Sequence, residues 1–283
     1  MNMRQRFLVL CLTLFACAAS YSWGFERQAH LEMSKTAVRL YHELYPSNSR
    51  DTDELTSLFI AASGREDDIT LSLQRLFNWH FYDPGSRLGR AWWGARKANT
   101  KRFASLAEKL FDSRGGDPRK TYEYAGRLAH HIQDMSSPPH TVPIYHTTKD
   151  PFDTFATEAI AGIRPATVQL DAVRAGRRDL TLDALQSMLK TAAERTTARV
   201  GKPVRYNGKE IVSDWTGFWR RYELTGPECE QEPKTGFGCY GMNTFGEPAG
   251  NFTPEVYLDF YKTQVASAIA DSLRLLLLLH DMK

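Results

Sequence analysis

The segment GRLAHHIQDMSSPPH, residues 126–140, carries the clearest structural signal in this sequence. Its apolar residues Leu128, Ile132 and Met135 recur at spacings of three and four, which predicts one buried stripe along a helix. His130 and Asp134 are four residues apart, so their side chains share a helix face and can bind one ion together.

The same segment predicts a sharp turn after the helix. Pro138 and Pro139 cannot continue a helix, so the chain must change direction there. His140 follows at once and can fold back toward His130 and Asp134. Imidazoles and a carboxylate gathered in this way suit zinc, which takes nitrogen and oxygen ligands at short range.

The N-terminus has the features of a cleavable export signal. Arg4 and Arg6 precede an apolar run over 7–19, and small residues including Ser22 follow it. The run is too short for a permanent membrane span. We therefore predict that residues 1–22 are a signal peptide, that the mature chain begins at Trp23, and that it is secreted or periplasmic without a transmembrane segment.

The cysteine positions and the net charge add to this prediction. Cys17 also allows a lipoprotein signal, although Phe15 fits that pattern poorly. Cys229 and Cys239 lie ten apart in a loop rich in glycine and proline, and an oxidising compartment favours a disulfide between them. The formal net charge of +3 falls by two when the signal leaves, and no basic tail marks a nucleic-acid-binding protein.

The remaining pattern predicts an all-α fold, with one domain over residues 23–283. The segment 201–252, rich in glycine, proline and aromatic residues, is expected to be an irregular surface segment with one helical insert at 215–222. The last helix looks apolar all round, which favours a buried core helix over a membrane anchor. The expected helices are 30–44, 53–63, 91–111, 118–135, 152–163, 181–200 and 254–280.

Most of the histidines of the chain fall at positions where they could serve one site. Together with carboxylates and the predicted N-terminal residue they form an ordered series: Trp23, His30, Asp67, His80, His130, Asp134, His140, His146 and Asp150. His131 adjoins His130 but points about 100° away on a helix, so it is interpreted as a structural or supporting residue.

In this order and spacing the chain resembles the bacterial zinc-dependent phospholipases C, whose wider superfamily includes single-strand-specific zinc nucleases. The motifs are the N-terminal Trp23 followed by His30, an acidic loop, His-Phe-Tyr-Asp-Pro from His80, and the spacing His-x-x-x-Asp-(x)5-His from His130. A later His-x-x-x-Asp ends at Asp150. The resemblance covers residues 23–150 and implies a single-domain helical bundle around a multi-zinc cleft, with two to three zinc ions.

The resemblance also implies which residues bind each ion. Asp67, His80, His130 and Asp134 would hold the first zinc, and Asp67 would also orient or deprotonate the attacking water. The amine and carbonyl of Trp23, with His30 and Asp134, would hold the second, so that Asp134 bridges both ions. His140, His146 and Asp150 would hold the third, with Asp153 and then Glu158 as replacements for Asp150, and Asp68 as an alternative to Asp67.

The expected activity is phospholipase C: hydrolysis of the glycerol-side phosphodiester of phosphatidylcholine or phosphatidylethanolamine, at a membrane or micelle surface. In members that prefer phosphatidylcholine, a Glu and a Phe at the positions of Glu26 and Phe77 contact the choline ammonium, by charge pairing and by cation–π attraction. The alternative interpretation is that Glu26 is a carboxylate in the first turn of a helix and that Phe77 belongs to the core.

Two other functions remain open at the level of sequence. A zinc nuclease or nucleotidase of the same superfamily would need aromatic platforms and a basic groove, which Trp92, Trp93 and the basic residues within 87–102 could supply. A non-enzymatic zinc-binding helical protein would instead have coordinatively closed sites. We expect a monomer without a stable nucleic-acid partner.

Overall fold

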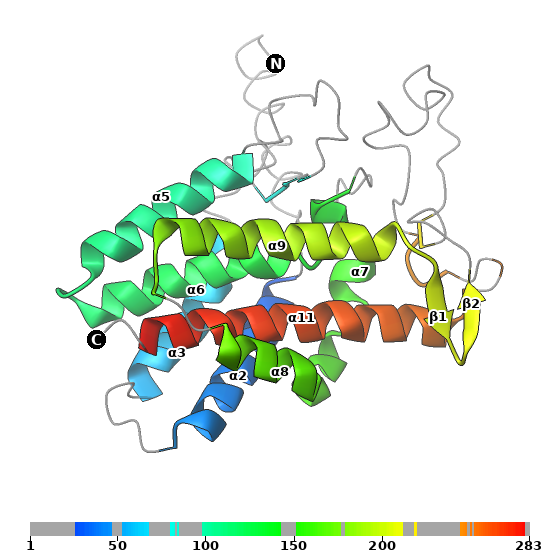
Figure 1. Ribbon diagram of the computed structural model, residues 1–283, viewed down its shortest axis with the longest axis horizontal. Coiled ribbons are helices and arrows are strands. Elements are labelled where there is room, and N and C mark those ends of the chain that lie inside the picture. The colour runs from blue at the N-terminus through cyan, green and yellow to red at the C-terminus, as the bar shows by residue number, and fades with distance from the viewer. Residues whose placement is uncertain are drawn as a thin grey trace, which may run out of the picture.

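The computed structural model describes residues 26–46, 53–67, 80–82, 84, 98–142, 151–176, 179–211, 218–219, 244–247, 250 and 252–280. Within these ranges the protein is all-α apart from one small β-hairpin, as predicted (Figure 1). The elements are α2 (Arg27–Leu44), α3 (Asp53–Ser63), the 3-10 turn η1 (Arg65–Asp67), α5 (Ala98–Ser113), α6 (Pro118–Asp134), η4 (Pro138–His140), α7 (Pro151–Thr154), η5 (Thr157–Gly162), α8 (Thr167–Ala175), α9 (Leu182–Val200), β1 (Val204–Tyr206), β2 (Lys209–Ile211) and α11 (Pro254–His280).

The helix α6 lies at the centre of the bundle. The side chain of Asp117 caps its first turn by accepting a hydrogen bond from the Arg119 N–H at 2.9 Å, and Pro118 occupies the first helical position, where its missing N–H costs nothing. The helix packs against α3, α5 and α11. Its apolar stripe, including Leu128 and Ile132, is fully buried, so the predicted orientation of this helix is confirmed.

The helix α11 is the second long element, and it runs beside α6 beneath α9 in the view of Figure 1. It contacts α2, α6, α8 and α9, and the run Leu275–Leu279 is buried. The prediction of a core helix is therefore correct. In the described part of the chain no helix combines the length and the apolarity that a bilayer span requires.

The turn after α6 also forms as expected. The chain enters η4 at Pro138, and the hydrogen bond from the Tyr82 N–H to the His140 carbonyl, at 2.9 Å, holds it against a distant segment. His140 is buried there, next to the C-terminal end of α6.

One predicted helix differs from the structure. The 152–163 helix is broken into α7 and the 3-10 turn η5, because Ala156 leaves helical geometry at φ −151°. Phe152 and Phe155, which both precede the break, pack their rings against Phe245 and Tyr261, and these tertiary contacts outweigh local helix propensity. The helix expected at 91–111 is described only from Ala98 onward, and α8 was not predicted.

The expectation of an irregular surface segment at 201–252 holds only in part, because its described residues include a largely exposed but regular β-hairpin and several buried aromatic side chains. Asn207 and Gly208 both have positive φ values, of 49° and 74°, and form the tight turn of the β1–β2 hairpin. Phe218 and Trp219 lie in a turn rather than in the expected helix, and both are buried with Phe245 and Phe252. Aromatic side chains in this segment therefore contribute to the core because their large apolar area is worth more buried than exposed.

Candidate metal centre

The C-terminal end of α6 supplies the first pair of polar side chains in the core. His130 and Asp134 lie one turn apart on the same face, and His130 Nε2 is 3.3 Å from Asp134 Oδ2. Both side chains are completely buried. The predicted i,i+4 pair is therefore formed, and it lies inside the bundle.

The helix α2 brings His30 to the same point. Its Nε2 atom lies 3.3 Å from Asp134 Oδ1, on the other oxygen of that carboxylate. The rings of His30 and His130 stack with their centroids 3.9 Å apart. Residues separated by about a hundred positions thus meet around one carboxylate because α2 and α6 both pack on α3 and α11.

Asp67 and His80 complete the cluster. Asp67, at the end of η1, places Oδ2 3.8 Å from His30 Nε2 and Oδ1 3.9 Å from His130 Nε2. His80 Nδ1 lies 2.6 Å from Asp134 Oδ2 and 3.1 Å from His130 Nε2. The structure therefore brings together all five of these sequence-predicted ligands.

The spacing of these atoms suits a metal ion. Two ligand atoms that are each about 2.0–2.1 Å from a tetrahedral zinc lie about 3.3 Å apart. Several of the separations above are close to that value. Among the described residues, three overlapping sets of side chains could each hold a metal ion: His30–His130–Asp134, Asp67–His80–His130 and His80–His131–Asp134.

The histidine rings are oriented by hydrogen bonds on the nitrogen that faces away from the cluster. His130 Nδ1 donates to the Ser63 carbonyl at 2.8 Å, and His140 Nδ1 donates to the His80 carbonyl at 3.1 Å. Because a carbonyl can only accept, these bonds fix the tautomer in which Nε2 carries a lone pair. Metal-binding histidines usually have such a partner on their other nitrogen.

Gln133 gives His30 the equivalent support. Its Oε1 accepts from His30 Nδ1 at 2.7 Å, while its Nε2 donates to the hydroxyls of Ser34 and Ser272 at 3.0 and 2.9 Å. The two serines therefore determine which way the amide points, and the amide determines which way the imidazole points. Sequence reasoning missed Gln133; its only signal was its position directly before Asp134.

Burial and neighbouring charges shift the pKa values of the titratable groups in the cluster in different directions. Burial alone would raise the pKa of Asp134, but the imidazoles of His130, His140 and His80 outweigh it and hold that pKa well below its usual range. Burial opposes protonation of His130, yet Asp134 and Asp67 outweigh it and raise its pKa to about 9. Burial lowers the pKa of His80, His131 and His140. The neighbouring carboxylates therefore favour the protonated form of His130 when no metal is bound.

Glu66, the neighbour of Asp67, anchors η1 through a buried ionic cluster that sequence reasoning did not identify. Its carboxylate is fully buried and accepts hydrogen bonds from the guanidinium groups of Arg102 on α5 and Arg127 on α6. His131 Nε2 lies 3.5 Å from it. Burial raises the pKa of Glu66, but His131 and the two arginines outweigh this and hold it below the usual range.

The proposed third set is only partly visible. His140 is buried at the end of η4, whereas His146 and Asp150 lie outside the described residues. Asp153, the first replacement, is buried and accepts a hydrogen bond from Ser137 Oγ at 2.9 Å. Glu158 is exposed. Neither Asp153 nor Glu158 belongs to a metal-binding set among the described residues.

Several other predicted residues lie outside the described residues, namely Trp23, Asp68, Phe77, Trp92, Trp93, Cys229, Cys239 and the signal peptide 1–22. Glu26 is described. It is half-buried immediately before α2, and its N–H donates to the Asp153 carbonyl at 3.4 Å. Glu26 thus begins the same helix that carries His30.

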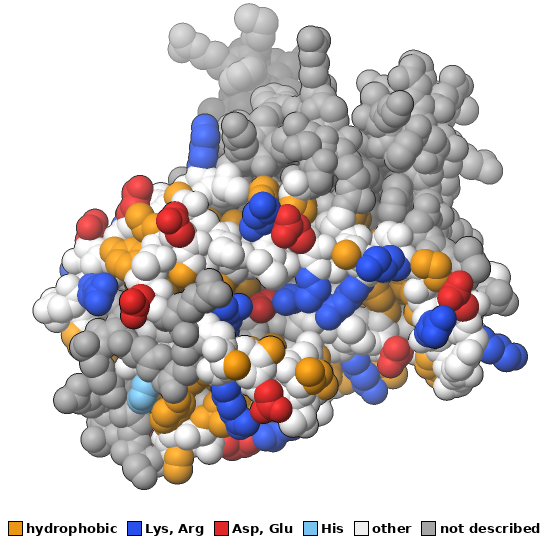
Figure 2. Space-filling view, viewed as in Figure 1, with side chains coloured by type: hydrophobic (Ala, Val, Ile, Leu, Met, Phe, Trp, Pro, Cys, Tyr) orange, Lys and Arg blue, Asp and Glu red, His pale blue; other side chains and the backbone are white. Residues whose placement is uncertain are grey.

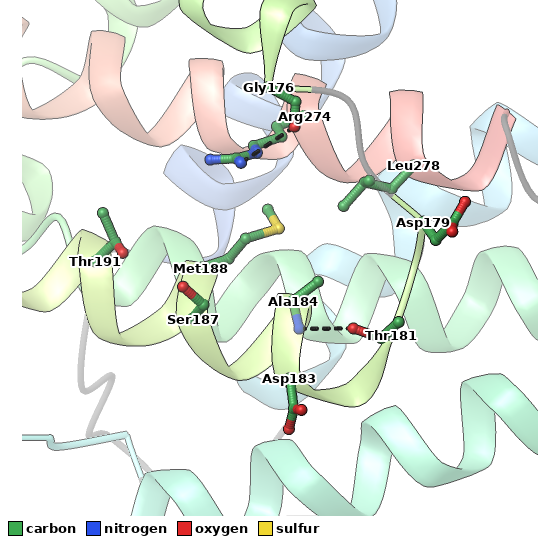
Figure 3. A pocket seen from close by; sticks show the side chains of 10 residues that line it. All are labelled: Gly176, Asp179, Thr181, Asp183, Ala184, Ser187, Met188, Thr191, Arg274 and Leu278. Atoms are coloured by element: carbon green, nitrogen blue, oxygen red, sulfur yellow. Dashed lines mark hydrogen bonds between the residues drawn. The ribbon is translucent and has the colours of Figure 1, made fainter.

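A separate cleft of about 480 Å³ lies between the start of α9 and the end of α11 (Figure 3). Arg274, Met188 and Ser187 are among the residues that line it, and Arg274 donates to the Gly176 carbonyl at 3.3 Å. None of the described candidate ligands lines this cleft. The metal centre and the cleft are therefore distinct features of the fold.

Comparisons with protein-family models, with curated proteins and with solved structures give no match for this chain.

Proposed function

We propose that this protein is a zinc-dependent phospholipase C. The observation that carries the proposal is the convergence of His30, Asp67, His80, His130 and Asp134 into one buried cluster at ligand spacing. The family resemblance assigns these residues, together with Trp23, to the first two zinc ions. Zinc suits a donor set of imidazole nitrogens and carboxylate oxygens.

The carboxylate of Asp134 has the geometry expected of a bridge. Its Oδ1 atom faces His30, while its Oδ2 atom faces His80 and His130. The second and first ions of the proposal would therefore bind opposite oxygens of this one side chain. Zinc ions bound there would act as Lewis acids on the phosphodiester.

The residues of the chain would then position the reaction. We assign Asp67 to orient the attacking water and to accept its proton, because its carboxylate lies at the edge of the cluster within 4 Å of two histidines. The water oxygen forms a bond to phosphorus, and the bond from phosphorus to the glycerol oxygen breaks. The products are diacylglycerol, which takes up a proton at that oxygen, and a phosphorylated head group. Glu26 is the proposed partner of a cationic head group.

The nuclease alternative would require a surface that can follow a phosphate backbone. On the face of the molecule seen in Figure 2, basic and acidic side chains of the described residues are interspersed. A nuclease that tracks a phosphate backbone would instead be expected to gather basic residues along a groove.

The test uses the mature chain beginning at Trp23, with zinc and with a chelator. Head-group release from phosphatidylcholine and phosphatidylethanolamine vesicles is measured beside nucleotide release from single-stranded DNA. We expect zinc-dependent lipid hydrolysis, abolished by Asp134→Asn and retained by Asp112→Asn, which changes an exposed carboxylate on α5. Cleavage of DNA with intact lipids would replace the proposal with a nuclease, and a zinc-loaded protein inert on both would refute catalysis.

A further inference from the structure

His131 has an environment unlike that of an ordinary core histidine. It is fully buried, and its ring lies 5.3 Å from the ring of His80 and 5.4 Å from that of His130, measured between centroids. Phe103 of α5 contacts it edge-on at 6.5 Å. The side chain therefore faces the metal centre on one side and the α5 core on the other.

The polar atoms of His131 need partners in this position. Among the described residues, neither ring nitrogen of His131 has a partner in good hydrogen-bond geometry, and the nearest carboxylate, that of Glu66, lies 3.5 Å from Nε2. Leaving a buried polar group unsatisfied destabilises the fold. A neutral imidazole has one N–H donor and one nitrogen lone pair. A hydrogen-bond acceptor for the N–H and a metal ion or hydrogen-bond donor for the lone pair would satisfy it.

Both partners can be identified from the surroundings. Glu66 offers an acceptor, with its Oε2 atom 3.5 Å from His131 Nε2, and the guanidinium groups of Arg102 and Arg127 hold that carboxylate in place. His131 also offers a ring nitrogen that lies within 4.8 Å of ligand atoms of His80 and Asp134. A carboxylate behind an imidazole that faces a metal is a common way to orient the ring and raise its basicity.

We propose that His131, with His80 and Asp134, holds a divalent cation that prefers nitrogen and oxygen ligands, such as Zn²⁺. This set shares His80 and Asp134 with the set that the family resemblance assigns to the first zinc, but it brings in His131 as a ligand, which changes our interpretation of His131 from a supporting residue. The inference rests on the proposed metal centre. In this arrangement Glu66 is a positioning residue, because it acts on the ion only through His131.

The first experiment measures bound zinc per chain by elemental analysis after dialysis against buffered free zinc. His131→Phe preserves an aromatic ring against Phe103, His131→Gln preserves polarity, and His42→Phe is the control because His42 lies half-buried outside the three sets. We expect the His131 variants to lose one ion or to bind it about 10- to 100-fold more weakly. Full zinc content with wild-type affinity in folded His131 variants would overturn the inference, even if their melting temperature fell.

A second measurement uses the wild-type chain, so it does not depend on whether a variant folds. The protein is labelled with ¹⁵N-histidine and loaded with ¹¹³Cd, and scalar coupling between cadmium and a ring nitrogen of His131 is sought by NMR. Coupling supports the inference, and coupling to the other histidines alone overturns it. A wild-type chain that binds neither metal would refute the metal centre itself, which separates that failure from the failure of this inference.

Discussion

At the scale of single residues, three histidines of the centre make a hydrogen bond through Nδ1 to a carbonyl or amide oxygen of the protein. His30 binds Gln133, His130 binds the Ser63 carbonyl, and His140 binds the His80 carbonyl. The rings are therefore oriented before an ion arrives. Pre-orientation reduces the conformational entropy that binding must remove, so the partners of these nitrogens should affect metal affinity although they do not touch the ion.

Gln133→Leu tests this support. The leucine has a similar size but lacks the Oε1 acceptor of His30 Nδ1, and we expect zinc affinity to fall by about 10- to 100-fold. Competition with a chromophoric chelator measures it. Gln28→Leu, an exposed change on α2, is the matched control. Equal affinities of the two variants would show that Gln133 serves only the packing of the core.

The pH dependence of zinc binding follows from His130. Because Asp134 and Asp67 raise its pKa from 6.5 to about 9, an ion must displace a proton from it below that pH. Affinity should therefore increase between pH 6.5 and 9, by at most about tenfold per pH unit for this single proton, and level off above. Zinc titrations across this range measure it, and a flat profile would contradict the assignment of the proton to His130.

Protonation of His130 weakens zinc binding, but it stabilises the metal-free fold. A raised pKa means that the folded chain binds more protons than the unfolded chain between pH 6.5 and 9. The stabilisation from His130 is fully present below pH 6.5 and is lost as the pH rises through about 9. Denaturant unfolding in chelator should therefore show the His130 contribution decreasing across this window.

Residue chemistry was the most predictable level of this protein. His130 and Asp134 could be paired from their spacing alone, because helix geometry fixes which side chains share a face. The link from His30 to Ser272 could not be predicted, since it joins residues on different helices through an amide that has no characteristic motif. The buried role of Glu66 was missed for a similar reason: in sequence it looks like part of an exposed acidic loop.

At the scale of elements, the contact between α3 and α6 controls the position of Asp67. Gly126 lies where α6 meets the backbone of α3, and a Cβ atom added there would be 2.2 Å from the Phe59 carbonyl oxygen and 2.8 Å from Ala62 Cβ. Glycine is required here because no side chain fits between the two helices. η1, with Asp67, begins two residues after α3 ends.

Gly126→Ala should therefore force the helices apart. We expect a loss of about 1–3 kcal/mol or more in the free energy of unfolding, because a rigid backbone cannot make room as a side chain could. Zinc affinity should also fall as Asp67 moves away from His130. Gly162→Ala is the control, since nothing lies within 4 Å of a Cβ atom there. Chemical unfolding and zinc titration measure both effects, and a variant as stable as the control would contradict this packing argument.

Element boundaries were predictable where local signals were strong. Asp53–Ser63 and Pro254–His280 match the sequence prediction, since each has a strong apolar pattern between clear end signals. The break between α7 and η5 was not predictable because it depends on aromatic partners from distant segments. The Asn-Gly signal at 207–208 was present in the sequence and was overlooked.

At the scale of the whole molecule, the proposed metal links helices that form one buried core. A ligand that binds only the folded state stabilises it by RT ln(1 + [L]/Kd), which is about 4 kcal/mol at a thousandfold excess over Kd. We therefore expect chelation to lower the melting temperature of the wild-type chain by several degrees or more. Differential scanning calorimetry measures it, and Asp134→Asn should lose this response to chelator. If chelator leaves the melting temperature of the wild-type chain unchanged, the prediction that bound metal stabilises the fold is wrong.

The hydrogen bond from Gln133 to Ser272 also has a consequence for the order of events during synthesis. The ribosome makes His30, Asp67, His80, His130 and Asp134 well before it makes α11, which carries Ser272. A nascent chain could therefore present all five of these side chains while the amide that orients His30 still lacks one of its two hydroxyl partners. The centre reaches its final shape only once the last described helix has been made and has docked, so tight uptake of the proposed metal would be a late event in the maturation of the protein.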